Sequence, residues 1–259
     1  MKKKFIDNLS QEIIINFPPQ RIISLVPSIT ELLFDLGLDN KIVGITKYCV
    51  HPKEKIKNKT IVGGVQNLNF VIIKNLKPDL IIANKEENDK DEITKLSKNH
   101  NVWISHVEQF DEALALIKNI GELTNKIEEA KEINKKIISK FYNNKIAPKN
   151  IKVAYLIWKN PYITINKNTF INDMIDMCGL INVFADKPEH YPEISFNDIK
   201  QAKPDFVLLS SEPYSFNTND AKEINEKLPF LKIKFVDGEM FSWYGSHILK
   251  SYDYFKTLF

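Results

Sequence analysis

An internal repeat constrains the fold of this chain more than any other feature of its sequence. The segment LKPDLIIANKEEN, residues 76–88, aligns without a gap with AKPDFVLLSSEPY, residues 202–214, at an offset of 126 residues. Upstream, NFVIIKNLKPD matches SFNDIKQAKPD at six of eleven positions, and the KPD triplet recurs whole. Each copy has the pattern of a helix, a turn and a strand, with Glu86 or Glu212 just beyond the strand. We therefore expect two lobes of similar build.

Short β-branched runs alternate with helical patterns along the chain, which is typical of a parallel α/β sheet. Strands are predicted over residues 21–26, 41–46, 79–84, 101–105, 151–158, 205–210 and 232–237. The segment PSITELLFDLGL is predicted to be a helix with a capping box at Ser28 and Glu31 and a stop at Gly37. A similar helix in the second half has Thr169 as its N-cap and ends at Gly179.

Between the two halves, the residues from Glu122 to about Ile146 carry apolar side chains at helical spacing, without a proline until Pro148. This pattern predicts one long amphipathic helix of ~20 residues that acts as a rigid connector. The expected fold class is α/β, with two similar α/β lobes, mostly parallel sheets and one long connecting α-helix. The expected domains are an N-terminal lobe over residues 1–121, the connecting helix over 122–147 and a C-terminal lobe over 148–259.

Composition narrows the possible partners and locations. A hydrophobic content of 43% and a charged content of 27% are typical of a soluble globular protein, and the net charge of +3 comes from scattered lysines. We therefore expect no nucleic-acid partner. No apolar run approaches the ~20 residues that a bilayer-spanning helix needs, so no membrane insertion is expected.

The opening segment MKKKFIDNLSQEIIINFPPQ lacks the apolar stretch of a secretory signal peptide. Cys49 and Cys178 suggest no disulfide framework, and free thiols suit a reducing compartment. We therefore expect a cytoplasmic location. A periplasmic or surface-anchored location is the alternative if the sequence lacks a leader segment.

Several motifs together resemble one superfamily of binding proteins. The chain resembles the helical-backbone metal receptors in three motifs, RIISLVPSITELLFDLGL, KIVGITKYCVHP and VGG followed by LKPDLIIA. It resembles them also in the long helix and second lobe that follow. These receptors are the vitamin B12, haem and ferric-siderophore substrate-binding proteins of ABC importers. Within this superfamily the chain resembles a branch that lacks a signal peptide, through the motifs CVHP, ANKEEN, IWKNPY, YPEIS, SSEPY and DGEMFSWYGS. The resemblance covers the chain from about Arg21 and implies a non-enzymatic protein with a ligand between its lobes.

Some positions depart from the pattern of the B12 receptors. Those receptors dock onto permease arginines through one surface glutamate in each lobe, and this chain has Val71 and Asn197 there. Neither side chain can form the ion pair, which argues against docking onto an ABC permease. Val65 and Asn84 replace tryptophans that line the corrin pocket, so we expect a more polar pocket.

The candidate ligand-binding residues follow the predicted strands, because open α/β sheets bind ligands beyond the carboxyl ends of their strands. They are Tyr48, Gln66, Asn67, Glu86, Trp158, Tyr162, Tyr191, Glu212, Tyr214, Trp243 and Tyr244. The aromatic side chains either stack on a planar ligand or pack at the lobe interface. The two glutamates either clamp a cationic or metal-bearing ligand or, in the case of Glu86, favour a helix N-terminus. The expected ligand is a small planar or metal-containing molecule, such as a cobalamin-like corrinoid, haem or another metal chelate.

Two other functions are weighed beside ligand binding. Cys49 and His51 point the same way if their segment is extended, and with nearby acids they would form a transition-metal site. The alternatives are a semi-buried cysteine and a turn histidine. A cytoplasmic metal-ion binding or sensor protein is thus a second hypothesis, and a hydrolase or isomerase that uses the paired glutamates is a third. No GxSxG, P-loop, GxGxxG or HExxH motif is present, so we predict no catalytic residues.

Overall fold

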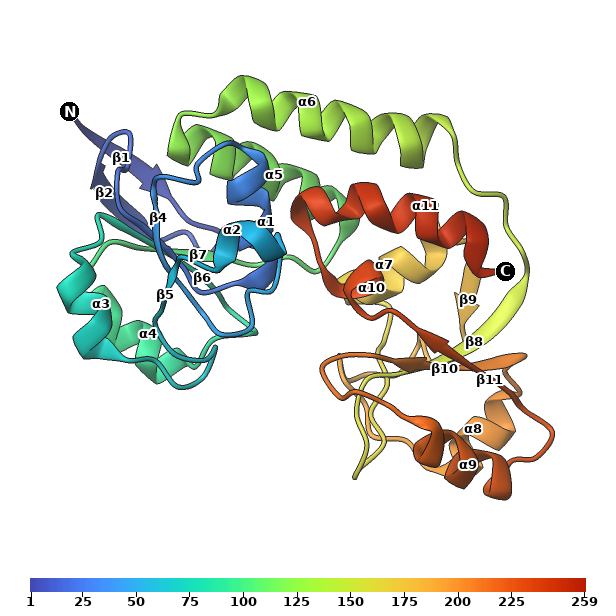
Figure 1. The fold of residues 1–259 in the computed structure, drawn as a ribbon. Helices are drawn as coiled ribbons and strands as arrows, with labels where there is room; N and C mark the ends of the chain where they lie inside the picture. The colour runs from blue at the N-terminus through green and yellow to red at the C-terminus, as the bar shows by residue number, and fades with distance from the viewer. The chain divides into compact units, whose positions relative to one another are not determined.

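The computed structural model describes residues 1–259 and divides into two compact units (Figure 1). The first unit consists of Met1–Val107, Asp111–Lys136 and Tyr244–His247. The second unit consists of Glu108–Phe110, Ile137–Trp243 and Ile248–Phe259. The predicted α/β class, with two units and mostly parallel sheets, is confirmed.

A five-stranded parallel sheet forms the core of the first unit, with the strand order β5-β4-β3-β6-β7. Its strands are β3 (Ile22–Ser24), β4 (Ile42–Ile45), β5 (Thr60–Ile61), β6 (Leu80–Asn84) and β7 (Val102–Ser105). The central strands β3 and β6 are buried along their whole length, which explains their continuous apolar runs. An antiparallel hairpin of β1 (Lys2–Ile6) and β2 (Glu12–Asn16) was not predicted, although β2 alternates exposed and buried residues as a half-buried strand does.

The helices of the first unit connect and cover these strands. They are α1 (Pro27–Asp35), α2 (Lys53–Ile56), α3 (Phe70–Leu76), α4 (Lys90–Ser97), most of α5 (Phe110–Thr124) and of α6 (Ile127–Ile138), and the 3-10 helix η2 (Gly245–His247). The predicted capping box of α1 is wrong. Pro27 occupies the first helical position and Val26 is the N-cap, so Ser28 lies inside the first turn. Gly37 does follow the helix, with a φ of +74°.

The predicted connecting helix begins later than its periodicity indicates. Residues 122–124 form the last turn of α5, Asn125 adopts a φ of +60°, and α6 starts at Ile127. A π-helical turn, η1 (Ser139–Asn143), follows α6. The apolar spacing continues across the break, and asparagine tolerates the left-handed conformation, so periodicity alone did not reveal it. A Cβ at Gly121 would collide with Ala130, so this glycine allows α5 and α6 to approach closely.

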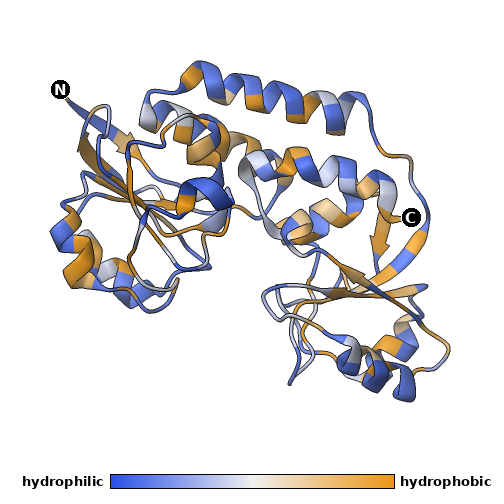
Figure 2. Cartoon of the chain, in the orientation of Figure 1, coloured by the Kyte–Doolittle hydropathy of each residue, from blue (hydrophilic) through white to orange (hydrophobic).

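A four-stranded parallel sheet forms the core of the second unit, with the strand order β11-β10-β8-β9. Its strands are β8 (Ile151–Leu156), β9 (Leu180–Asn182), β10 (Phe206–Ser210) and β11 (Lys232–Val236), and its helices are α7 (Phe170–Met177), α8 (Phe196–Ala202), α9 (Thr218–Lys227), α10 (Glu239–Ser242) and α11 (Ile248–Leu258). Thr169 caps α7 and Gly179 has a φ of +79° after it, as predicted. Figure 2 shows mixed hydrophobic and hydrophilic bands along helices such as α6, as expected for amphipathic helices.

The internal repeat is a repeat of structure. The helices α3 and α8 start and end at equivalent positions of the alignment, and so do the strands β6 and β10. Asn69 and Ser195, which are equivalent, cap the two helices with their side chains. Lys77 and Lys203 end them in the left-handed conformation, with φ values of +46° and +50°.

The last residue of the KPD triplet also has one role in both copies. Asp79 accepts backbone hydrogen bonds from Gln20 and Arg21, at 2.8 and 2.9 Å. Asp205 accepts one from Lys152, at 2.8 Å. In both units the aspartate thus holds the start of the neighbouring strand. In each KPD triplet, the lysine therefore ends the helix, the proline separates the helix from the strand, and the aspartate binds the start of the neighbouring strand.

Candidate functional site

The strand order of each sheet indicates where a ligand would bind. In the first unit the chain passes from β3 to β4 on one side and later to β6 on the other, so the order reverses between β3 and β6. In the second unit the same reversal lies between β8 and β10. Ligands of open α/β sheets bind beyond the carboxyl ends of the strands at such a switch point. The loops after β6 and β10 belong to the internal repeat.

A buried asparagine organises the loop after β6. Asn84 is 4% exposed, and its side-chain oxygen accepts hydrogen bonds from the backbone N–H groups of Glu86 and Glu87, at 2.7 and 2.9 Å. Its amide nitrogen donates to the hydroxyl of Tyr244 at 2.9 Å and to that of Ser105 at 3.2 Å. The side chain therefore fixes the turn that presents Glu86, which is exposed.

The hydroxyl of Tyr244 extends this network to a carboxylate. It donates to Oε1 of Glu87 at 3.2 Å, and the tyrosine side chain is only 5% exposed. Burial, and the charge of Glu87, raise the pKa of Tyr244 well above its ordinary value. The hydroxyl therefore stays protonated and remains a donor at neutral pH.

The loop after β10 repeats the turn with a different strand-end residue. The hydroxyl of Ser210, the equivalent of Asn84, accepts the backbone N–H of Glu212 at 3.3 Å. The carboxylate of Glu212 accepts hydrogen bonds from Nε1 of Trp243, at 3.0 Å, and from the hydroxyl of Ser242. Burial, with the charges of Glu239 and Asp237, raises the pKa of Glu212. The two predicted glutamates thus differ, because Glu86 is exposed and Glu212 is half-buried.

Two of the predicted aromatic residues of the second unit, Trp158 and Tyr214, form a partly exposed cluster. Trp158 is 40% exposed, and its ring centroid lies 5.8 Å from that of Tyr214 in an edge-to-face arrangement. Tyr162 is 9% exposed and packs on Phe196 instead. Tyr191 is 44% exposed, in the loop before α8. Trp158 and Tyr191 are therefore the exposed large aromatic side chains among these predicted residues.

A charged network supports this cluster. Lys159 donates to Asp220 and Glu223 at 2.7 and 2.6 Å, and both carboxylates raise the pKa of Lys159. The hydroxyl of Tyr214 approaches Asp220 at 3.4 Å, and that of Tyr162 donates to Glu223 at 3.2 Å. Burial, with the charge of Glu223, raises the pKa of Tyr162 to about 12. The tyrosine hydroxyls are thus committed to structural contacts.

In the first unit, Tyr48 lies beside the turn that carries the two predicted polar residues. Tyr48 is 49% exposed, and Gly64 faces its ring so closely that a Cβ there would lie 3.5 Å from Cε2. Gln66 and Asn67 form the exposed tip of the turn, which is closed by a hydrogen bond from Gly64 to Asn67 at 2.9 Å. The side chain of Asn88 ties this turn to the β6 loop by donating to the carbonyl of Val65 at 3.0 Å.

The predicted metal ligands Cys49 and His51 differ in burial, because Cys49 is buried and His51 is half-buried. Cys49 is 3% exposed, and its sulfur lies 3.1 and 3.3 Å from the hydroxyls of Thr30 and Thr46. Burial raises the pKa of Cys49, which disfavours the thiolate that binds metals. The ring of His51 lies 5.9 Å from that of His247.

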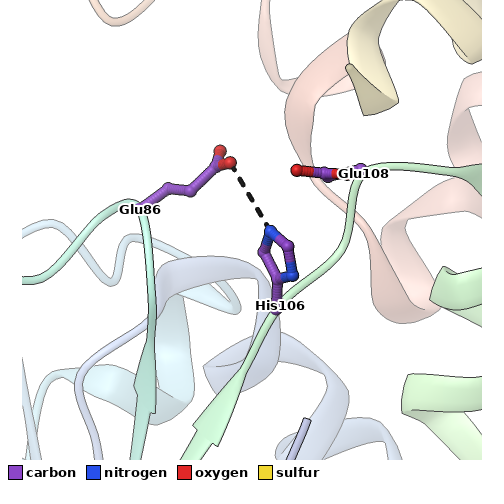
Figure 3. A group of neighbouring side chains, drawn as sticks. All are labelled: Glu86, His106 and Glu108. Atoms are coloured by element: carbon purple, nitrogen blue, oxygen red, sulfur yellow. Dashed lines mark ion pairs between the residues drawn. The ribbon is translucent and has the colours of Figure 1, made fainter. Parts of the chain in front are cut away.

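Figure 3 draws an acidic and a basic side chain from the loops after β6 and β7. Nε2 of His106 lies 3.8 Å from Oε1 of Glu86, and Nζ of Lys85 lies 3.2 Å from the same nitrogen. The third labelled side chain, Glu108, belongs to the second unit, where its carboxylate lies 3.9 Å from Nδ1 of His190. The side chain of Lys85, which lies beside the His106 nitrogen, opposes a cation at this position of the first unit.

Four residues of the site were not predicted from the sequence as polar anchors: Asn84, Asn88, Ser242 and Lys159. The alignment of the repeat placed Asn84 opposite Ser210, two residue types that both accept backbone hydrogen bonds in turns. That signal was sufficient to predict both turns. The partners of Ser242 and Lys159 lie 30 and 61 residues away, so no local pattern revealed them.

Two α/β units of repeated build, with polar and aromatic loops at the carboxyl ends of their strands, define a solute-binding protein. The family described as "Periplasmic binding protein" matches residues 22–232. The chain therefore belongs to the periplasmic binding protein family. This confirms the resemblance found in the sequence.

Individual relatives share most of their length with this chain. The vitamin B12-binding protein of Vibrio cholerae serotype O1 is 27% identical over 198 residues, which cover 75% of this chain and 71% of the relative. The uncharacterized ABC transporter substrate-binding lipoprotein YvrC of Bacillus subtilis is 28% identical over 215 residues, covering 79% and 68%. The solved structure of the periplasmic heme-binding protein RhuT from Roseiflexus superposes with a TM-score of 0.76 at 18% identity, covering 92% and 97%, which shows a shared fold.

These comparisons correct the expected location. The prediction of a cytoplasmic protein is wrong, because the family is one of periplasmic proteins and the relatives are described as periplasmic or as a lipoprotein. They point to a location outside the cytoplasm. The free cysteines misled the prediction. Cys49 and Cys178 are 3% and 0% exposed, and a buried thiol that packs as a small apolar group carries no information about the compartment.

No helix of the structure has both the length and the apolar composition needed to span a bilayer.

Proposed function

We propose that this chain is a substrate-binding protein for a small planar metal chelate, with a corrinoid or haem as the first candidates. The observation that carries the proposal is the position of the exposed aromatic and acidic residues. Tyr48 and Glu86 in the first unit, and Trp158 and Tyr191 in the second, lie in the loops that follow the strands. The family and the B12-binding and heme-binding relatives support the same ligand class.

The proposal assigns different tasks to the predicted site residues. The exposed aromatic residues stack on the ligand, and each contributes about 0.5–1.5 kcal/mol beyond the area it buries. Glu86, Gln66 and Asn67 supply polar contacts at the first unit. Tyr162 is buried and Glu212 is half-buried, and both support the loops through hydrogen bonds.

The proposal includes no catalytic step. Glu212 would be the natural general acid, because burial raises its pKa. Its carboxylate, however, accepts hydrogen bonds from Trp243 and Ser242, which fix it as part of the loop. This supports a binding role for the acidic loops. One relative is described as an ABC transporter substrate-binding lipoprotein, and we propose that any docking of this chain onto a permease does not use the glutamate pair of the B12 receptors. Val71 is 69% exposed on α3 and carries no charge.

An absorbance titration of the purified chain tests the proposal. Cyanocobalamin, hemin and a ferric siderophore are each added to the protein, and we expect saturable binding of at least one of them. Trp158→Ala should weaken that binding about tenfold, since it removes a stacking surface. Phe230→Ala is the matched control, because Phe230 is 60% exposed and precedes the amino end of β11. The candidate ligand loops follow the carboxyl ends of the strands. Absence of saturable binding for the whole panel would refute the proposed ligand class.

A further inference from the structure

We infer that Trp243 and Tyr244 are positioning residues, each of which holds one of the two equivalent acidic loops of the repeat. The inference rests on the proposed function, because these loops matter as ligand loops only if the chain binds a ligand there. The two residues follow α10 and precede η2, and the chain passes from the second unit to the first between them. Both side chains are buried, at 7% and 5% exposed.

In the first unit, Tyr244 acts on the loop after β6 through Asn84. Its hydroxyl oxygen accepts a hydrogen bond from the side-chain amide nitrogen of Asn84 at 2.9 Å. This contact fixes which end of the amide faces the turn. The amide oxygen then accepts the N–H groups of Glu86 and Glu87. The same hydroxyl donates to the carboxylate of Glu87 at 3.2 Å. One hydroxyl group therefore orients both the backbone and a side chain of the loop.

The position of Tyr244 is itself set by the first unit. Gly245 has a φ of +89° and faces Leu32 of α1, where a Cβ would meet the Leu32 Cβ at 3.4 Å. Two residues further on, Nδ1 of His247 donates to Oε2 of Glu31, also in α1, at 2.6 Å. Both side chains of this pair are almost fully buried. The segment Tyr244–His247 is thus held by α1 at one end and presents its tyrosine to the β6 loop at the other.

In the second unit, Trp243 acts directly on the loop after β10. Its indole N–H donates to Oε1 of Glu212 at 3.0 Å, and the hydroxyl of Ser242 donates to the same oxygen. Glu212 is the equivalent of Glu86 in the repeat, and its own backbone N–H is held by Ser210. Consecutive residues of one segment therefore position equivalent loops. Removal of either contact should loosen one loop and leave the other unchanged.

Hydrogen exchange of the full chain, followed by mass spectrometry, tests this separation. In Tyr244→Phe, which keeps the ring and removes the hydroxyl, we expect the amides of Glu86 and Glu87 to exchange about tenfold faster. In Trp243→Phe, which removes the indole N–H, the same change is expected at Glu212 and absent from the β6 loop. Tyr252→Phe is the control, because it removes a hydroxyl that donates to the carbonyl of Asn144 and touches neither loop.

A conservative replacement of the acceptor separates positioning from general destabilisation. Glu87→Gln keeps an oxygen for the Tyr244 hydroxyl, so the β6 loop should exchange nearly as in the wild type. Glu87→Ala removes the contact of Tyr244 with Glu87 but keeps its contact with Asn84, so the β6 loop should exchange faster than in the wild type and more slowly than in Tyr244→Phe. Equal acceleration of both loops in each variant, or exchange unchanged in Tyr244→Phe and Trp243→Phe, would overturn the inference.

The ligand titration is repeated on Tyr244→Phe and Trp243→Phe with whichever chelate binds the wild type. Each variant should bind it several-fold more weakly, with Tyr252→Phe unchanged. If no chelate binds the wild type, the proposed function fails, and the exchange data still decide whether these residues position the loops. If the chelate binds both variants as it binds the wild type, the inference fails and the proposed function stands.

Discussion

The buried pair of Glu31 and His247 should contribute strongly to the stability of the first unit. The histidine Nδ1 and the glutamate Oε2 are 2.6 Å apart, and the two side chains are 1% and 4% exposed. Glu31→Ala removes the acceptor and leaves a cavity beside a buried histidine. Loss of one partner of a buried pair typically costs about 3–5 kcal/mol. For a unit of this size, that corresponds to a fall of roughly 10–17 °C in the melting temperature.

Chemical unfolding followed by circular dichroism measures this cost, and differential scanning calorimetry resolves the two units. Glu31→Gln retains an acceptor and should lose less than half as much. Glu54→Ala is the surface control, because Glu54 pairs with Lys57 at 2.7 Å but both side chains are more than half exposed. Such exposed pairs contribute only about 0–1 kcal/mol. The reasoning is refuted if Glu31→Ala is no less stable than Glu54→Ala.

Two further predictions concern stability. The folded-state pKa of Glu212 is raised by burial, so the folded protein binds this proton more tightly than the unfolded chain. The stabilisation is complete below the unfolded pKa and is lost as the pH rises through the folded pKa. The free energy of unfolding should therefore fall more steeply above about pH 4.5 in the wild type than in Glu212→Gln, and parallel pH profiles would contradict this. Gly121→Ala should destabilise the chain by about 1–3 kcal/mol, because the new Cβ collides with Ala130. Gly64→Ala is the comparison, since its Cβ would meet only ordinary contacts at 3.5 Å, and equal melting temperatures would contradict the collision.

The parts of the fold that were predicted correctly depend on local chemistry. Thr169 as an N-cap and Gly179 as a helix end are set by neighbouring atoms, so short patterns reveal them. The same reasoning failed at Ser28, because the helix starts at Pro27, two residues earlier than a Ser28 N-cap requires, and Glu31 pairs with a distant residue instead. That partner lies 216 residues along the chain, beyond any local pattern.

The candidate site shows the same division. The repeat predicted that Glu86 and Glu212 would follow equivalent strands, and they do. It did not predict that Glu86 is exposed whereas Glu212 is half-buried and hydrogen-bonded to Trp243 and Ser242, because these two partners lie outside the repeat. The alternation of strands and helices thus predicts where loops lie, whereas long-range contacts decide what each loop presents.

The discontinuous composition of the first unit has a consequence for biosynthesis. Its main part is complete in sequence at Lys136, yet Tyr244–His247 belongs to the same unit. A ribosome that adds about 5–20 residues per second needs roughly 5–20 s to reach His247 after Lys136. Until then Glu31 has no His247 to pair with, and Asn84 has no Tyr244. The first unit of the nascent chain therefore stays incomplete until this tetrapeptide, far downstream of Lys136, has been synthesised.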